Sequence, residues 1–98
     1  MADVFGNTTA VMIGGTGQVG TTAEALDGVT GVKAALGVLV KNIDSTEDLL
    51  VGTVKNVPTT TVGFTLQPGE EHFFPVEDTF NIRVIASANT TDYTWVQY

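Results

Sequence analysis

The sequence predicts an all-β protein, an antiparallel β-sandwich or small barrel, and three observations support this prediction. Apolar residues recur with a period of two far more often than with the helical period of about 3.6. Turn signals arrive about every ten residues from Gly28 onward, as in sandwiches and barrels. No stretch of the 98 residues has the spacing of a long amphipathic helix. We therefore expect one β-sandwich domain at residues 10–98, preceded by an amino-terminal arm at residues 1–9.

The first two predicted elements are this arm and a glycine-rich loop. The arm places Val4 and Phe5 between polar residues and a Gly-Asn pair, a composition that is typical of an irregular terminal segment. Residues 14–20, GGTGQVG, are predicted as a glycine-rich loop, or as a bulged edge where the backbone runs close to another part of the molecule.

The middle of the chain is predicted to contain a hairpin and a half-buried strand. Residues 37–54 read as the hairpin, because the apolar runs GVLVKNI and LLVGTV flank the polar turn DSTED. Val62, Phe64 and Leu66 alternate with small or polar residues, so we expect them to share one face and Phe64 to lie in the core. The sequence QPGE then predicts a type II turn at residues 67–70.

Three strands are predicted after this turn. The run HFFPV is short, and Pro75 restricts it to the edge of a sheet. A polar turn follows at residues 77–79. The runs IRVIASA and DYTWVQY, separated by the turn residues 89–91, are then predicted to form a closing hairpin.

Composition excludes several classes of function. Eleven acidic and four basic residues give a net charge of -7, which disfavours binding to nucleic acid or to an anionic membrane. The absence of cysteine excludes disulfides and thiolate metal sites. No apolar run has the length of a membrane span, and MADVFGNTTA lacks the basic start of a signal peptide, so we expect a soluble chain made in a cytoplasm. Only 15% of the residues are charged, so much of the surface must be uncharged or covered by partners.

A dinucleotide-binding fingerprint is the first candidate chemical motif. Gly15, Gly17 and Gly20 match G-x-G-x-x-G, and Asp44 stands where an acid would bind the ribose. However, residues 21–27 form a poor helix, and no helical period follows Asp44. A nucleotide-binding protein therefore stays only a remote alternative, and we expect no cofactor.

Metal and acid-base sites are the second candidate chemistry. His72 is the sole histidine, and of its acidic neighbours only Glu70 can share its face of a strand, which leaves too few ligands. Asp44, Glu47 and Asp48 offer oxygen ligands for Ca²⁺, although a solvated turn is the simpler interpretation. We therefore expect no catalytic residues, no metal and no enzymatic activity, with Ca²⁺ left as an open alternative.

Aromatic residues suggest interfaces instead. All of them except Phe5 lie after residue 63, and Phe73 and Phe74 are consecutive, so they cannot both face one core. Tyr93 and Trp95 share a strand face, with Tyr98 on the other, and such a row would either fill a core or stack on sugar rings. The candidate interface residues are Val4, Phe5, Phe73, Phe74, Phe80, Tyr93, Trp95 and Tyr98.

Residues 22–98 carry a recognisable succession of strands and turns. It comprises GVLVKNI, a polar turn, LLVGTVKNV, TVGFTLQPGEEHFFPVED, NIRVIASA and a final YTWVQY. This pattern resembles small β-sandwich virion proteins of tailed bacteriophages. The first 21 residues lie outside the resemblance.

The resemblance implies a structural component of a virion rather than an enzyme. It favours a capsid decoration (cement) protein that binds the major capsid protein on the outer surface of the head after synthesis in the host cytoplasm. It also implies a homo-oligomer, with a trimer favoured, and a role for the arm in reaching a neighbour. The alternative is a host-surface or glycan-binding module on a head fibre, neck or tail.

Overall fold

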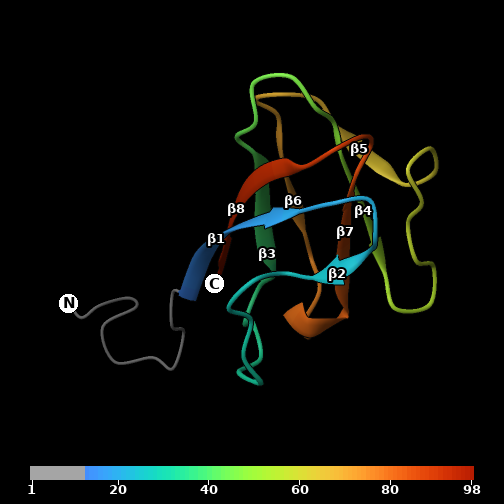
Figure 1. Ribbon diagram of the computed structural model, residues 1–98. Coiled ribbons are helices and arrows are strands. Elements are labelled where there is room, and N and C mark those ends of the chain that lie inside the picture. Colours follow the sequence, from blue (N-terminus) through green and yellow to red (C-terminus); the bar gives the residue numbers. More distant parts are fainter. Residues whose placement is uncertain (1–12) are drawn as a thin grey trace.

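The computed structural model describes residues 13–98, which form two antiparallel sheets of four strands packed face to face (Figure 1). In spatial order, sheet A contains β1 (Ile13–Val19), β8 (Thr91–Gln97), β3 (Val38–Asn42) and β6 (Glu71–Phe74). Sheet B contains β2 (Glu24–Ala25), β7 (Ile82–Ala86), β4 (Leu49–Thr53) and β5 (Phe64–Leu66), and the short 3-10 helix η1 (Thr79–Asn81) precedes β7. The predicted all-β sandwich is confirmed. The arm, with Val4 and Phe5, lies outside the described residues.

The core lies between the sheets and follows the alternation of the strands. Along β8, every second residue faces inward, so Tyr93, Trp95 and Gln97 are buried. In β3 the same alternation buries Val38 and Val40. Sheet B contributes the opposing apolar side chains Leu49, Val51, Leu66, Ile82, Val84 and Ala86.

Asn42 is a polar residue with no exposed surface, and its side chain connects three segments. Its Nδ2 donates to the backbone carbonyls of Glu47 and Leu66, each at 2.9 Å. Its Oδ1 accepts from the backbone N–H of Asp44 at 2.9 Å. Because every one of these groups is paired, the amide fixes the end of β3 relative to β4 and β5 without leaving an unsatisfied polar atom.

The two predicted hairpins are wrong, although their strands exist. β3 belongs to sheet A and β4 to sheet B, and β7 and β8 are likewise in different sheets. Sheets pack about 10 Å apart, and residues 43–48 and 87–90 are long enough to cross that gap. Each polar connection therefore joins the two sheets instead of closing a hairpin within one.

Residues 14–20 do not form the predicted loop. Most of them belong to β1, an edge strand that is paired with β8 from Ile13 to Val19. The predicted edge position and close backbone approach are both present: a Cβ on Gly17 would lie 2.6 Å from the Tyr93 hydroxyl oxygen and also against the Asp27 carboxylate. Glycine is required there because the Tyr93 ring lies directly beneath the strand.

Residues 54–63 fold back over the outer face of sheet B. Leu50 and Ile85, paired in register, point away from the main core but are 3% and 4% exposed. A Cβ on Gly63 would lie 3.1 Å from both Leu50 Cβ and Pro58 Cβ, which places buried Pro58 over Leu50. This segment therefore gives sheet B a small second apolar layer.

The predicted strand at residues 62–66 is shorter than expected and faces the core only once. β5 begins at Phe64, and Val62 and Phe64 are 66% and 46% exposed, whereas Leu66 is buried. The assignment of Phe64 to the core is therefore wrong, because β5 is the edge strand of sheet B and its first residue lies at the rim of the sandwich. The predicted edge position of HFFPV is confirmed, since β6 is the last strand of sheet A.

Candidate functional site

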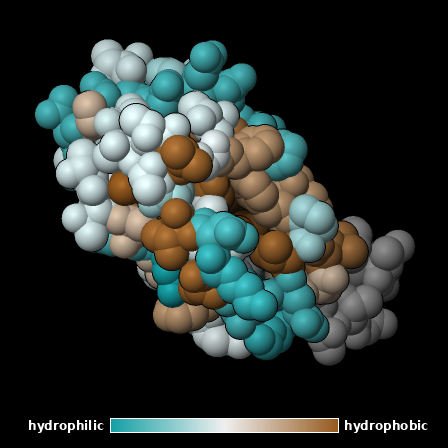
Figure 2. All heavy atoms as spheres, turned by 90° about the vertical axis from the view of Figure 1, so that its right-hand side faces the viewer, coloured by the Kyte–Doolittle hydropathy of each residue, from teal (hydrophilic) through white to brown (hydrophobic). Residues whose placement is uncertain are grey.

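An open groove lies between residues 54–63 and strands β4 and β5. Its volume is about 370 Å³. Figure 1 shows the yellow-green segment looping out beside β5, and Figure 2 looks onto this side, where apolar residues in brown and tan gather in a band. The groove is lined by Val51, Gly52, Thr53, Asn56, Val57, Pro58, Val62, Gly63 and Phe64.

The local sequence explains why the groove exists. A Cβ on Gly52 would lie 2.5 Å from the Asn56 carbonyl oxygen and 2.8 Å from Pro58 Cδ, so the missing side chain lets the returning segment approach β4. The turn is closed by a hydrogen bond from the Thr53 N–H to the Asn56 carbonyl oxygen at 3.1 Å. The Asn56 N–H also donates to the Thr53 hydroxyl at 3.1 Å.

The groove is apolar and almost uncharged. Among its lining residues, Val57, Val62 and Phe64 are 55%, 66% and 46% exposed. Residues 49–69 contain no acid, and Lys55 is their one ionisable side chain, in a protein with a net charge of -7. Exposed apolar side chains gathered on an uncharged face are typical of a protein interaction site.

An aromatic cluster holds the rim of this groove. The Phe64 ring centroid lies 4.4 Å from that of His72 and 5.4 Å from that of Phe74, and the latter two are 4.9 Å apart. Phe64 belongs to β5 and the other two to β6, so the cluster joins the edges of the two sheets. His72 thus packs against the Phe64 and Phe74 rings in tilted and edge-to-face contacts, a packing role that sequence analysis did not identify.

Phe73 and Phe74 point to opposite faces of β6, as their adjacency requires. Phe74 packs against the core, whereas Phe73 is 36% exposed on the outer face of sheet A. The Tyr98 ring lies 6.0 Å from that of Phe73. Phe74 thus reaches the rim of the groove through Phe64, whereas Phe73 and Tyr98 lie on the outer face of sheet A and do not join it in one site.

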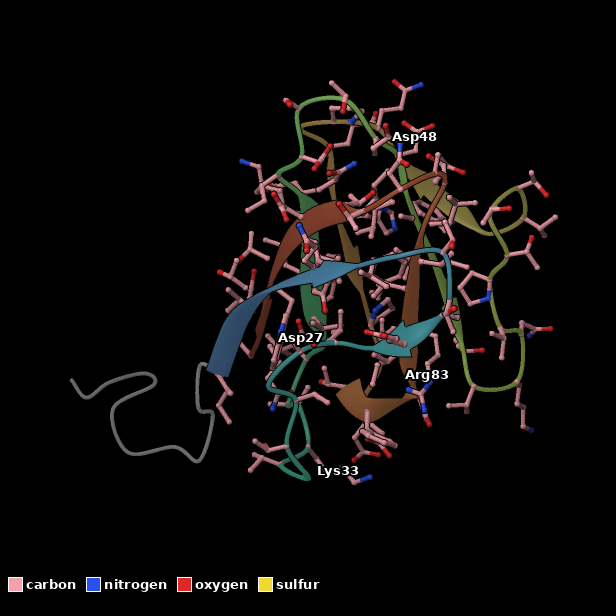
Figure 3. The ribbon with its side chains drawn as sticks, viewed as in Figure 1. Asp27, Lys33, Asp48 and Arg83 are labelled. Atoms are coloured by element: carbon pink, nitrogen blue, oxygen red, sulfur yellow. The ribbon has the colours of Figure 1, made fainter. Side chains whose placement is uncertain are left out.

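Phe80 is exposed in η1 and interacts with its own chain. The guanidinium carbon of Arg83 lies 4.8 Å from the centroid of the Phe80 ring, and the same guanidinium donates to the carbonyls of Phe80 and Ile82. Figure 3 shows Arg83 near η1, at the end of the sandwich that also carries Lys33. Lys33 pairs there with Asp78 at 3.1 Å, and this contact lowers the pKa of Asp78.

Tyr93 and Trp95 do not form an exposed platform, so this part of the interface prediction is wrong. Each is 1% exposed. The Tyr93 hydroxyl accepts from the Asp27 N–H at 2.8 Å, and Trp95 Nε1 donates to the Asp27 carbonyl at 2.8 Å. Asp27, labelled in Figure 3, lies in the turn after β2 and closes the sandwich between β1 and β2. The alternation of residues along β8, in which every second side chain faces the core, was the sequence signal for this burial.

We expect the free energy of unfolding to fall at alkaline pH, because the Tyr93 phenol is buried in the folded protein. Burial, with the negative charges of Asp27 and Glu24, raises the pKa of Tyr93 to about 12, against a hydrogen bond from the Asp27 N–H that lowers it. In the unfolded chain the tyrosine phenol has a pKa near 10. The contribution of the neutral phenol to the free energy of unfolding is therefore complete below pH 10 and is lost as the pH rises to 12. Each unit of difference between the two pKa values corresponds to about 1.4 kcal/mol. Denaturant unfolding at pH 9 to 12 tests this, and Tyr93→Phe should flatten the decline. An equally steep decline in Tyr93→Phe would contradict the assignment.

At the end of the sandwich opposite Lys33 (Figure 3), the carboxylate of Asp44 stabilises the turn that follows β3. Asp44 Oδ2 accepts from the N–H groups of Thr46 and Glu47 at 3.1 and 2.9 Å, and Oδ1 accepts from the Asp92 N–H at 3.3 Å. These bonds, the one from Glu47 first, lower the pKa of Asp44. Over residues 13–98, no three acidic, histidine or cysteine side chains converge as metal ligands would.

The geometry of a dinucleotide site is not present around the glycine fingerprint. Gly15 and Gly17 lie within β1, not in a turn that leads from a strand to a helix. Residues 21–27, which the cofactor interpretation needs as a helix, contain the short strand β2. The fingerprint therefore has a structural explanation, the close packing of β1 on the rings of Tyr93 and Trp95.

Comparisons with protein-family models, curated proteins and solved structures found no match for this chain. In the described part of the chain, no helix is long and apolar enough to cross a membrane. The function proposed below therefore depends on the groove, the charge distribution and the sequence resemblance.

Proposed function

We propose that this protein is a non-enzymatic structural protein of a bacteriophage virion, a capsid decoration subunit that binds the major capsid protein on the outside of the head. The observation that carries the proposal is the apolar, acid-free groove beside β5 in a protein that is otherwise acidic. The β-sandwich fold and the strand pattern of residues 22–98 are consistent with the virion proteins that the sequence resembles.

The groove suits a partner that inserts an apolar segment. Full burial of a valine or phenylalanine contributes about 1.5–3 kcal/mol relative to full exposure. Val57, Val62 and Phe64 are 55%, 66% and 46% exposed, so each can still contribute roughly half of that, which is enough together for moderate affinity. A capsid repeats its binding site many times, and subunits that associate with one another gain avidity from that repetition. Moderate affinity at each groove is therefore sufficient for a decoration protein.

The charge distribution supports an orientation with the groove toward the shell. Asp48 marks the end of the sandwich opposite Lys33 (Figure 3), and at this acidic end the backbone N–H of Asp92 donates to the Asp44 carboxylate. Acidic surface facing the solvent keeps subunits soluble and repels nucleic acid. The groove face, by contrast, loses little charge solvation when a partner covers it.

A charge placed in the groove tests the proposal. We expect Val62→Asp to reduce the affinity of the purified protein for undecorated capsids at least tenfold, because binding would bury an unpaired carboxylate. Thr61→Asp is the matched control: it adds the same charge at the neighbouring exposed position, which does not line the groove. Occupancy is measured by co-sedimentation with capsids across protein concentrations, and circular dichroism verifies the fold of each variant.

Two outcomes would count against the proposal. Equal occupancy of Val62→Asp and Thr61→Asp would show that the groove is not the attachment site. Failure of the unaltered protein to bind capsids at any concentration would remove the decoration function itself. The host-surface alternative has no comparable support, since two of its three platform residues, Tyr93 and Trp95, are buried and only Tyr98 keeps exposed surface.

A further inference from the structure

The edges of the two sheets differ in how well they are protected from pairing with another strand. In sheet B, β2 has two residues and β5 has three. In sheet A, β6 carries the charged Glu71 and is followed by Pro75. The remaining edge, β1, has seven residues, IGGTGQV, without a charge or a proline. Short length, charge and proline are the usual protections of an edge strand, and β1 has none of them.

The register of β1 shows which of its backbone groups point outward. Thr16 lies opposite Thr94 and Gln18 opposite Asp92. The Gln18 N–H donates to the Asp27 carboxylate at 3.3 Å, so it points away from β8. Alternate residues of an antiparallel strand share this orientation, which means that Gly14 and Thr16 also direct their N–H and C=O groups outward. Among residues 13–98, no strand lies beyond β1 to receive them.

We propose that β1 pairs with β1 of a second copy of this chain, antiparallel and about a two-fold axis at Gly15. In this register Gly14 exchanges two hydrogen bonds with Thr16 of the second copy, and Thr16 does so with Gly14 of the second copy. The two Gly15 residues then form a non-hydrogen-bonded pair, in which backbones approach to about 4.5 Å between Cα atoms. The two A sheets become one continuous sheet.

Charge favours a second copy as the occupant of this edge. Two molecules of net charge -7 repel each other, and β1 is a surface on which they can meet without opposing charges. The acids nearest to β1 lie along its second half: the Asp27 carboxylate is against Gly17 and Gln18, and Asp92 contacts Gln18. Antiparallel pairing about Gly15 places these acids at opposite ends of the interface, one pair from each copy.

The inference does not depend on the proposed capsid function, and it specifies a closed pair where the sequence resemblance favours a trimer. A two-fold contact uses the same surface on both copies and therefore stops at a dimer.

Removing the outward N–H of Thr16 provides a sharp test. Proline is tolerated on an edge strand where the N–H faces away from the sheet, so Thr16→Pro should spare the ladder with β8.

The experiment measures mass by sedimentation equilibrium on the isolated full chain over a range of concentrations. We expect the unaltered protein to pass from monomer to dimer, and Thr16→Pro to raise the dissociation constant at least tenfold. Thr16→Lys, which adds a charge to the edge strand, should also raise the dissociation constant, and it replaces the proline variant if that variant is unstable. Thr90→Lys is the matched control, because it makes the same change at an exposed turn residue and should dimerise normally.

Amide hydrogen exchange provides the second readout. In the dimer the N–H groups of Gly14 and Thr16 should exchange slowly, and this protection should disappear on dilution. Three results would overturn the inference: a monomer at every concentration, protection of Thr16 that does not change with concentration, or a trimer that Thr16→Pro leaves intact. Because no capsid is present, these results are independent of the attachment experiment.

Discussion

The Asn42→Asp variant is expected to lose about 3 kcal/mol or more of its free energy of unfolding, which is a large part of the stability of a small domain. The change preserves the shape of the side chain but replaces the Nδ2 donor with an acceptor. The carbonyls of Glu47 and Leu66 would each lose a hydrogen bond at 2.9 Å and face a buried negative charge instead. Buried unpaired acceptors and charges are among the costliest defects in a fold.

Denaturant unfolding of purified protein at pH 7 measures this effect. Asn56→Asp is the control, since Asn56 is exposed and its side chain makes no hydrogen bond within residues 13–98, so a change below about 0.5 kcal/mol is expected. Acidification should recover part of the loss in Asn42→Asp, because a protonated carboxyl regains one donor. A cost for Asn42→Asp no larger than that of the control would show that this amide does not fix β3, β4 and β5 together.

The second large effect is expected for Gly17→Ala. The new Cβ would lie 2.6 Å from the Tyr93 hydroxyl oxygen and 2.7 Å from Tyr93 Cζ, so either β1 or the buried ring must move. Overpacking of this kind costs about 1–3 kcal/mol. The upper part of that range is expected, because Tyr93 is also held through its hydrogen bond with Asp27.

Gly20→Ala provides the matched control at the next glycine of the segment. Its Cβ would meet only the Asn89 carbonyl oxygen, at 3.7 Å, which is an ordinary contact. Thermal and denaturant unfolding of both variants should therefore separate them by at least 1 kcal/mol. Equal stability would mean that β1 shifts freely on β8 and that the glycines in it are not required for packing.

The strands that carry a clear alternation could be predicted from the sequence. In β3 and β8 every second residue is buried, so their two faces are visible in the order of the residues. The edge position of β6 followed from Pro75, which cannot complete a ladder in the middle of a sheet. Local patterns of this kind report which face of a strand is covered.

Pairing partners and the groove could not be predicted, because they depend on contacts between distant residues. The turn at residues 43–48 looks the same whether it closes a hairpin or crosses to the other sheet. The conformational freedom of glycine suggested a loop at residues 14–20, yet burial of Tyr93 and Trp95 beneath β1 outweighs that freedom. One signal was available: the consecutive apolar residues of β4, Leu49 to Val51, indicate a strand covered on both faces.

The order of strands in sheet A has a consequence for how the molecule is made. β8 lies between β1 and β3, so until synthesis has passed Gln97 β1 has no neighbour in the sheet and β3 has only β6. Apart from β4 with β5, every pair of consecutive strands is divided between the two sheets, so early hairpins offer little help. Topologies dominated by such distant pairings fold in about milliseconds to seconds. During that interval apolar segments such as β1 are unpaired and open to aggregation, and the mutual repulsion of chains with a net charge of -7 opposes it.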